Sequence, residues 1–124
     1  MAIMEGTMML IYVLFCHWIN DFVGQGYLFP SLEIGKNKSK SVLILWLHIF
    51  LYSLGMWLML WPFMGGWSAF WFMMLNGGSH LIIDSVTSKL SSKAYVDGNI
   101  RWFWTVIGFD QFLHVAILCA TLPS

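Results

Sequence analysis

The sequence predicts an all-α protein, a bundle of four transmembrane helices that forms a single domain over residues 1–124. Hydrophobic residues make up 59% of the chain and charged residues only 10%, and the mean hydropathy is +0.73. These values are too apolar for a soluble domain of this size. Four apolar stretches each approach the ~20 residues that a helix needs to cross a bilayer. All six lysines and arginines lie outside these stretches.

The first helix is expected at about residues 3–27. Its apolar core, residues 8–22, is short, so the helix reaches spanning length only if it begins near residue 3 or continues toward residue 27. No basic residue precedes the apolar run, and no small-residue cleavage site follows it before Asn20 and Asp21. The segment is therefore interpreted as a spanning helix and not as a cleaved signal peptide.

The other three helices are expected at about residues 42–61, 63–86 and 102–122, where the remaining apolar runs lie. The connection between the second and third helices, around Pro62 and Gly65, carries no charge. It is therefore expected on the side of the membrane opposite to the basic connections.

The basic residues fall in two connections, which define the expected topology. Lys36, Lys38 and Lys40 lie between the first and second helices, and Lys89, Lys93 and Arg101 lie between the third and fourth. The positive-inside rule places both connections in the cytoplasm and both termini outside. The net charge is zero and no basic stripe is present, so no nucleic-acid partner is expected. The lipid bilayer is the expected partner.

Ionisable residues inside the apolar stretches are the main functional signal. His17 and Asp21, His80 and Asp84, and Asp110 and His114 form three pairs with i, i+4 spacing, which places both members on one helix face. A carboxylate at the centre of a bilayer costs ~2.5 to 3.5 kcal/mol on insertion scales. Three such residues therefore indicate a functional site and not a scaffold.

The alternating direction of the helices brings these pairs to one level. In every pair the aspartate lies nearer the cytoplasm than its histidine, although the fourth helix runs in the opposite direction to the first and third. This common order predicts one shared site in the cytoplasmic half of the bundle. Further polar residues are expected beside it: His48 and Tyr52 from the second helix, and the amides Gln25, Asn76 and Gln111.

The charge of three buried aspartates requires compensation. No lysine or arginine lies within the spans, and the nearest, Lys89 and Arg101, lie toward the membrane surface. A metal ion, protonated carboxyls and protonated histidines remain as alternatives. A mixed set of imidazole and carboxylate ligands suits Zn, Mn, Fe or Ni, so one or two divalent ions are expected.

Each polar residue is given an expected role. Metal ligands are expected at His17, His80, Asp84 and His114, and catalytic groups at Asp21, His48 and Asp110. Residues that support the ligands through hydrogen bonds are expected at Gln25, Tyr52, Asn76 and Gln111, and a phosphate or lipid headgroup is expected at Lys89. For a single histidine or amide, helix packing is the more common role.

Four short motifs and one lysine make the chain similar to a known family. HWINDFVGQ from His17, LHIFLY around His48, HLIID from His80, the following Lys89, and DQFLH from Asp110 resemble the small bacterial and phage membrane proteins grouped as domain of unknown function 3307. The resemblance covers nearly the whole chain. It implies a bacterial or phage protein of the cytoplasmic membrane, marks most of the residues named above, and implies no established activity.

Three functions are compatible with the sequence. The first is a metal-dependent hydrolase that acts on a lipid-type substrate at the inner leaflet, although no HExxH signature is present. The second is a transporter or channel subunit that conducts protons or cations, which would require a homo-oligomer because four helices make a thin pathway. The third is a non-catalytic structural protein, in which His80→Gln or Asp84→Asn would impair folding and little else.

Overall fold

The computed structural model describes residues 6–27 and 29–122, and all regular structure in this part of the chain is helical. An N-terminal rod consists of α1 (Gly6–Trp18), a π-helix (Ile19–Val23) and α2 (Gly24–Tyr27). A 3₁₀ turn (Pro30–Leu32) and α3 (Ile34–Asn37) follow. Three long helices complete the chain: α4 (Val42–Met64), α5 (Gly66–Val96) and α6 (Ile100–Thr121). The prediction of an all-helical protein is confirmed.

Three segments are long and apolar enough to cross a membrane: Gly6–Tyr27, Val42–Met64 and Ile100–Thr121. The remaining long helix, α5, does not meet this criterion although it has 31 residues. Its C-terminal half is rich in serine, threonine and lysine, which lowers its hydropathy. Three of the four expected helices are therefore long and apolar enough to span a membrane, and the fourth is not.

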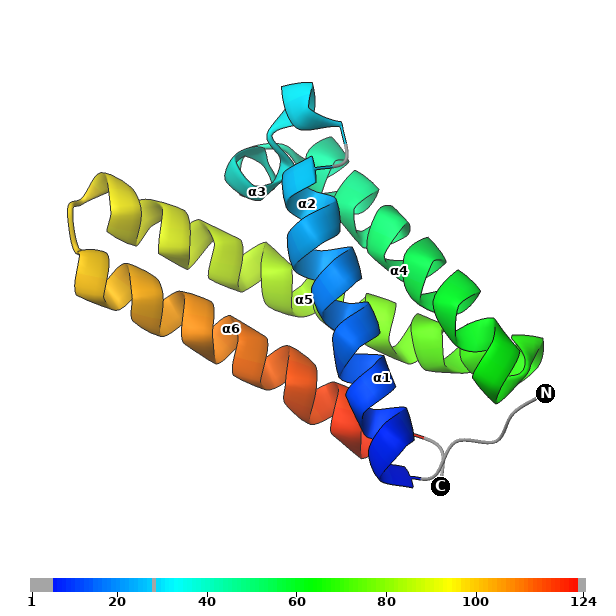
Figure 1. Ribbon diagram of the computed structural model, residues 1–124. Coiled ribbons are helices and arrows are strands. Elements are labelled where there is room, and N and C mark those ends of the chain that lie inside the picture. Colours follow the sequence, from blue (N-terminus) through cyan, green and yellow to red (C-terminus); the bar gives the residue numbers. More distant parts are fainter. Residues whose placement is uncertain (1–5, 28, 123–124) are drawn as a thin grey trace.

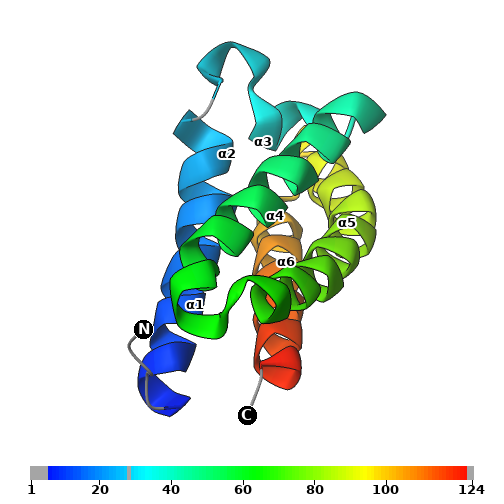
Figure 2. The ribbon, with the colours of Figure 1, turned by 90° about the vertical axis from the view of Figure 1, so that its right-hand side faces the viewer.

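The long helices pack in sequence order. Helix α5 lies between α4 and α6 and contacts both, and the N-terminal rod packs against α4 and α6. Figures 1 and 2 show that the start of α1, the end of α6 and the α4–α5 connection lie at one end of the molecule. Helices α2 and α3 and the α5–α6 turn lie at the other end. The basic residues near α3 and the α5–α6 turn therefore share one end.

Two helix ends lie beyond the expected positions. Helix α4 continues through Pro62 to Met64, because it ends where Gly65 adopts a φ of 84° and the chain reverses. Helix α5 continues ten residues past position 86, as far as Val96. A fall in hydropathy along the sequence does not end a helix. Helix α5 ends because the chain turns at Gly98, which has a φ of 75°. Residues 3–5 of the expected first helix lie outside the described residues.

The distribution of side chains is the reverse of that in a soluble protein. Large apolar side chains on all the long helices are exposed, for example Leu43 (77%), Ile82 (69%) and Phe112 (64%). The buried set includes eleven polar or charged residues, among them three aspartates and four histidines. An apolar exterior of this extent is typical of a surface that contacts lipid or a partner protein.

An apolar cluster fills the interior at the end that holds the chain termini. It consists of residues from α1, α4, α5 and α6: Val13, Cys16, Tyr52, Met56, Leu60, Ala69, Phe72 and Leu118. The buried histidines and aspartates follow directly along each helix toward the opposite end. The interior is therefore layered, with the polar cluster next to an apolar layer along the helices.

We expect Gly55→Ala to destabilise the protein by about 1 to 3 kcal/mol, because the added methyl group would overlap a packed side chain. A Cβ at position 55 would meet the Asn20 side chain, which is held by a 2.8 Å hydrogen bond from Nδ2 to the Cys16 carbonyl. Gly78→Ala is the matched control, since a Cβ there meets no atom within 4 Å. Thermal unfolding in detergent should show a lower midpoint for Gly55→Ala only; equal midpoints would contradict the close contact.

Candidate metal centre

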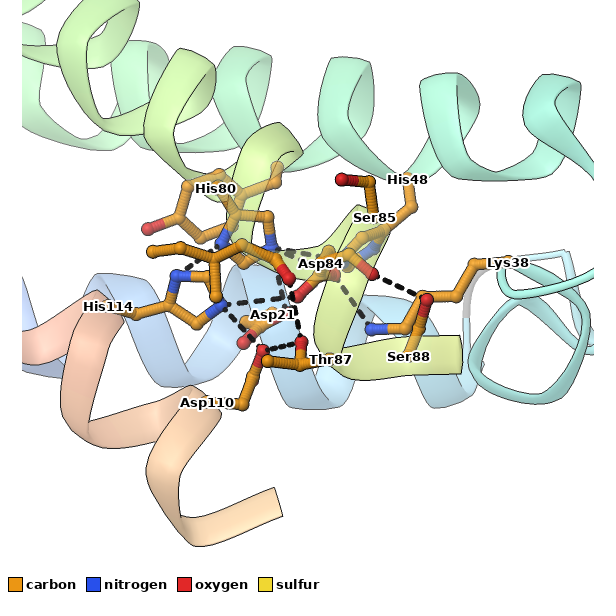
Figure 3. A network of polar contacts seen from close by, with 12 residues as sticks. Asp21, Lys38, His48, His80, Asp84, Ser85, Thr87, Ser88, Asp110 and His114 are labelled. Carbon is orange, nitrogen blue, oxygen red and sulfur yellow. Dashed lines mark hydrogen bonds and ion pairs between the residues drawn. The ribbon is translucent and has the colours of Figure 1, made fainter. Parts of the chain in front are cut away.

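Six buried histidines and aspartates from four helical segments converge on one site (Figure 3). The π-helix contributes Asp21, α4 contributes His48, α5 contributes His80 and Asp84, and α6 contributes Asp110 and His114. Each of these residues is at most 8% exposed. All six residues come from one chain.

The π-helix determines how Asp21 enters the site. Its i, i+5 hydrogen bonding adds one residue to the turn that carries Asp21, which changes the direction of this side chain relative to a regular α-helix. His17 Nε2 and Asp21 Oδ2 are 3.8 Å apart, whereas Asp21 Oδ1 lies 3.2 Å from His48 Nε2 and 3.3 Å from His80 Nε2. Asp21 therefore faces the histidines of α4 and α5 more closely than its neighbour in sequence.

Four donor atoms in this site have the spacing of a tetrahedral metal centre. They are Asp21 Oδ1, His48 Nε2, His80 Nε2 and Asp84 Oδ2, and all lie within 4.8 Å of one another. Five of the six distances between them are 3.0, 3.2, 3.2, 3.3 and 3.5 Å. Ligands at about 2.1 Å from a tetrahedral Zn²⁺ are about 3.4 Å apart.

The charges of this group favour a cation at its centre. Two carboxylate oxygens face the same point, and they repel one another unless a positive charge lies close to both. The two imidazole Nε2 atoms are only 3.0 Å apart. When both nitrogens carry lone pairs, a shared cation satisfies them together, as in protein zinc sites. These residues therefore fit a divalent ion in both geometry and donor chemistry.

The second nitrogen of His80 has a partner that fixes its proton. His80 Nδ1 lies 3.1 Å from His114 Nδ1, and the two rings stack with centroids 4.0 Å apart. A neutral imidazole that binds a metal through Nε2 carries its proton on Nδ1. His80 then donates to His114 Nδ1, and His114 Nε2–H donates to Asp84 Oδ1 at 3.2 Å and Asp110 Oδ1 at 3.3 Å.

This hydrogen-bond chain argues against a second ion bound through His114. Asp21, Asp110 and His114 form another group whose donor atoms lie within 4.8 Å. If His114 Nε2 bound a metal as well, both Nδ1 atoms would carry protons and face each other at 3.1 Å. The arrangement therefore accommodates one ion, with His114 supporting His80 through a hydrogen bond.

His17 supports the carboxylates indirectly. Gln111 Nε2 donates to Asp21 Oδ2 at 3.1 Å and to Asp110 Oδ2 at 2.9 Å, so its Oε1 is left to accept from His17 Nε2 at 3.1 Å. His17 Nδ1 then accepts from the Tyr52 hydroxyl at 2.9 Å. Both ring nitrogens of His17 therefore have protein partners, and His17 belongs to neither group of possible metal ligands.

A lysine compensates the site, contrary to the expectation from the sequence. Lys38 Nζ lies 2.8 Å from Asp84 Oδ2, and the lysine side chain is only 13% exposed. The nearest cations were expected at Lys89 and Arg101, toward the membrane surface; that expectation was wrong. Position 38 lies directly after α3, which returns the chain to the bundle through the buried Ile34.

A cleft of about 700 Å³ lies beside the site at the end that carries the lysines. Asp110 and Thr87 line its inner part, where Thr87 Oγ1 donates to Asp110 Oδ1. Lys36, Lys38 and Lys40 line it as well. Asp110 thus faces both the cleft and the buried cluster.

The other residues expected at the site lie in different places. Gln25 lines the cleft, and its Oε1 is buried without a hydrogen-bond partner among the described residues. Asn76 lies on the side of the termini, where it donates to Phe72 O and Thr121 Oγ1. Lys89 is exposed and does not line the cleft.

The sequence reasoning missed the polar face that leads from the site to the cleft. Thr87, Ser88 and Ser91 are buried and follow Asp84 at i+3, i+4 and i+7. This spacing forms a stripe on one helix face. It was detectable in the sequence as a polar continuation of the third helix, beyond the end assigned from hydropathy.

Comparison with known proteins identifies a family. The model of a protein family of unknown function, DUF3307, matches residues 9–123. Neither curated proteins nor solved structures gave a match.

Proposed function

We propose that this chain, which belongs to the DUF3307 family of unknown function, is an intramembrane metal-dependent hydrolase. The observation that carries this proposal is the near-tetrahedral spacing of Asp21, His48, His80 and Asp84. Zn²⁺ suits this donor set and geometry best, with Mn²⁺, Fe²⁺ and Ni²⁺ as alternatives.

Because four protein ligands fill a tetrahedral coordination sphere, the metal would supply a nucleophilic water near neutral pH by expanding to five ligands. Asp110 is the proposed general base. Asp110 lies within hydrogen-bonding distance of Thr87, Gln111 and His114, which hold its carboxylate in place. It faces the cleft but is not one of the four proposed ligands. Its position between cleft and metal centre is the one that a base acting on a bound water requires.

We propose that the protein spans a bacterial cytoplasmic membrane with both termini outside and the cleft at the inner leaflet. Support comes from the extensive exposed apolar surface and from the gathering of basic residues at the end with the cleft. A site at this depth can reach the linkage region of a lipid, so a lipid-type substrate is proposed.

Conduction of ions is less favoured by the arrangement. The apolar layer that contains Val13, Met56, Leu60 and Leu118 separates the polar cluster from the end that holds the termini. A pathway within one chain would have to cross this layer, where no ionisable group other than Tyr52 and Cys16 is buried. The cleft is therefore the better supported route to the site.

Asp110→Asn tests the proposed function. We expect the wild type to contain about one transition-metal ion per chain by elemental analysis, and the variant to retain it. Hydrolysis of a chromogenic p-nitrophenyl alkanoate or p-nitrophenyl phosphate should fall at least ~100-fold in the variant, the contribution typical of a general base.

Wild-type protein purified without chelator but free of metal would overturn the proposal. Equal turnover in the wild type and Asp110→Asn would show that Asp110 is not the general base. Two ions per chain would contradict the hydrogen-bond chain from His80 to His114.

A further inference from the structure

The cleft has two chemically different walls. One wall is polar and consists of the lysines near α3 together with serines of α5, including Ser88, Ser91 and Ser92. Ser39 and Ser92 share a 2.8 Å hydrogen bond between their hydroxyls, which ties the lysine-bearing segment to α5. The position of Lys38 is fixed by the same packing and by its contact with Asp84.

The other part of the lining is apolar. It is formed by the end of α5 and the first half of α6, with Phe103, Val106 and Ile107 among its residues. Val106 is only 4% exposed, whereas Tyr95, at the edge of the cleft, is 63% exposed. A small polar anion would leave this wall without contacts. A ligand with a charged head and an apolar body would contact both walls.

The positive charges at the cleft indicate which kind of head group it binds. Lys36 and Lys40 are exposed at the cleft, and Lys38 lies deeper, between these lysines and the proposed metal centre. A divalent ion together with lysines suits a phosphate group, for which lysine acts as a point charge. Basic pockets on the cytoplasmic side of membrane proteins bind phosphate-bearing head groups for the same reason.

A buried acceptor adds a second requirement for the ligand. The Gln25 side chain lines the cleft, and its Oε1 atom is buried without a hydrogen-bond partner among the described residues, a state that costs about 1 to 3 kcal/mol unless a donor reaches it. A hydroxyl group on the ligand is a suitable donor. A lipid head with both phosphate and hydroxyl groups satisfies the lysines and Gln25 together.

We propose that the cleft binds a lipid with a phosphate-bearing head group, its phosphate directed at Lys38 and its chain against the α6 wall. This inference rests on the proposed function, because it names the substrate class of the same site. Lys36 and Lys40 attract the head group at the entrance, and Lys38 holds it beside the metal centre.

Binding of dodecyl phosphate tests the proposal without any need for turnover. Full-length protein in uncharged detergent is titrated with dodecyl phosphate, dodecyl phosphocholine or inorganic phosphate, and bound molecules are counted by native mass spectrometry. We expect one dodecyl phosphate per chain, with at least 10-fold weaker binding of the other two probes. The double variant Lys36→Gln/Lys40→Gln should weaken binding of dodecyl phosphate at least 10-fold, and Lys89→Gln should leave it unchanged.

Metal content is measured on the same samples, so the two proposals can fail separately. Metal-loaded protein that binds dodecyl phosphate no better than dodecyl phosphocholine would overturn the lipid proposal and leave the metal site intact. Equal weakening by Lys89→Gln and by the double variant would also overturn it, since Lys89 lies off the cleft. Inorganic phosphate bound as tightly as dodecyl phosphate would identify a site for the free anion instead.

Discussion

His48→Ala is expected to lower metal affinity about 1000-fold, whereas His17→Ala is expected to lower it about 10-fold. A protein zinc site with four ligands has a binding free energy of about 10 to 16 kcal/mol, so each ligand accounts for up to ~4 kcal/mol. His48 Nε2 lies among the proposed ligand atoms. His17 Nε2 lies 3.8 Å from Asp21 Oδ2 and contacts Gln111, which donates to Asp21. Competition with a chromogenic chelator measures both affinities.

This pair of variants distinguishes two assignments of the same histidines. The spacing in the sequence favours His17 as a ligand and His48 as a catalytic group, and the tertiary structure favours the opposite roles. Both side chains are buried, at 4% and 2% exposed, so their loss from the interior is comparable. A larger loss of affinity in His17→Ala than in His48→Ala would restore the assignment from the sequence.

Removal of the metal from the wild type is expected to lower the thermal unfolding midpoint by about 10 °C. A ligand present at about 1000 times its dissociation constant stabilises the native state by about 4 kcal/mol, and about 1 kcal/mol corresponds to a few degrees in a chain of this size. Without the ion, the Asp21 and Asp84 carboxylates both crowd His48 Nε2 at 3.2 Å, and Lys38 contacts only Asp84. Unfolding followed by tryptophan fluorescence, with and without EDTA, measures the shift.

The control is His48→Ala, whose midpoint should not respond to EDTA because the variant holds little metal. A chelator effect of equal size in both proteins would show that EDTA acts elsewhere. An unchanged wild-type midpoint after verified metal loss would mean that the cluster stabilises itself through its hydrogen bonds, as the structural hypothesis requires.

The local sequence pattern was sufficient to predict the fold class and to identify the polar residues that are buried. The apolar runs predict helices because a chain in lipid must satisfy its backbone hydrogen bonds internally. The cost of burying charge made Asp21, Asp84 and Asp110 conspicuous, and the structure brings them together with His48, His80 and His114. The ends of the helices were less predictable. Helix α5 continues ten residues beyond its apolar run, because hydropathy indicates contact with lipid and not where a helix ends.

The sequence by itself therefore determined that this chain is helical and apolar outside, with a set of histidines and aspartates at one level. The tertiary structure alone decided which of their atoms meet. Asp21 lies closer to His48 and His80 than to His17, and the packing of α4 against α5 places His48 beside His80. Lys38 reaches Asp84 across 46 residues of sequence. Spacing within one helix specifies a shared face, but the contacts between helices depend on how they pack, which no local pattern encodes.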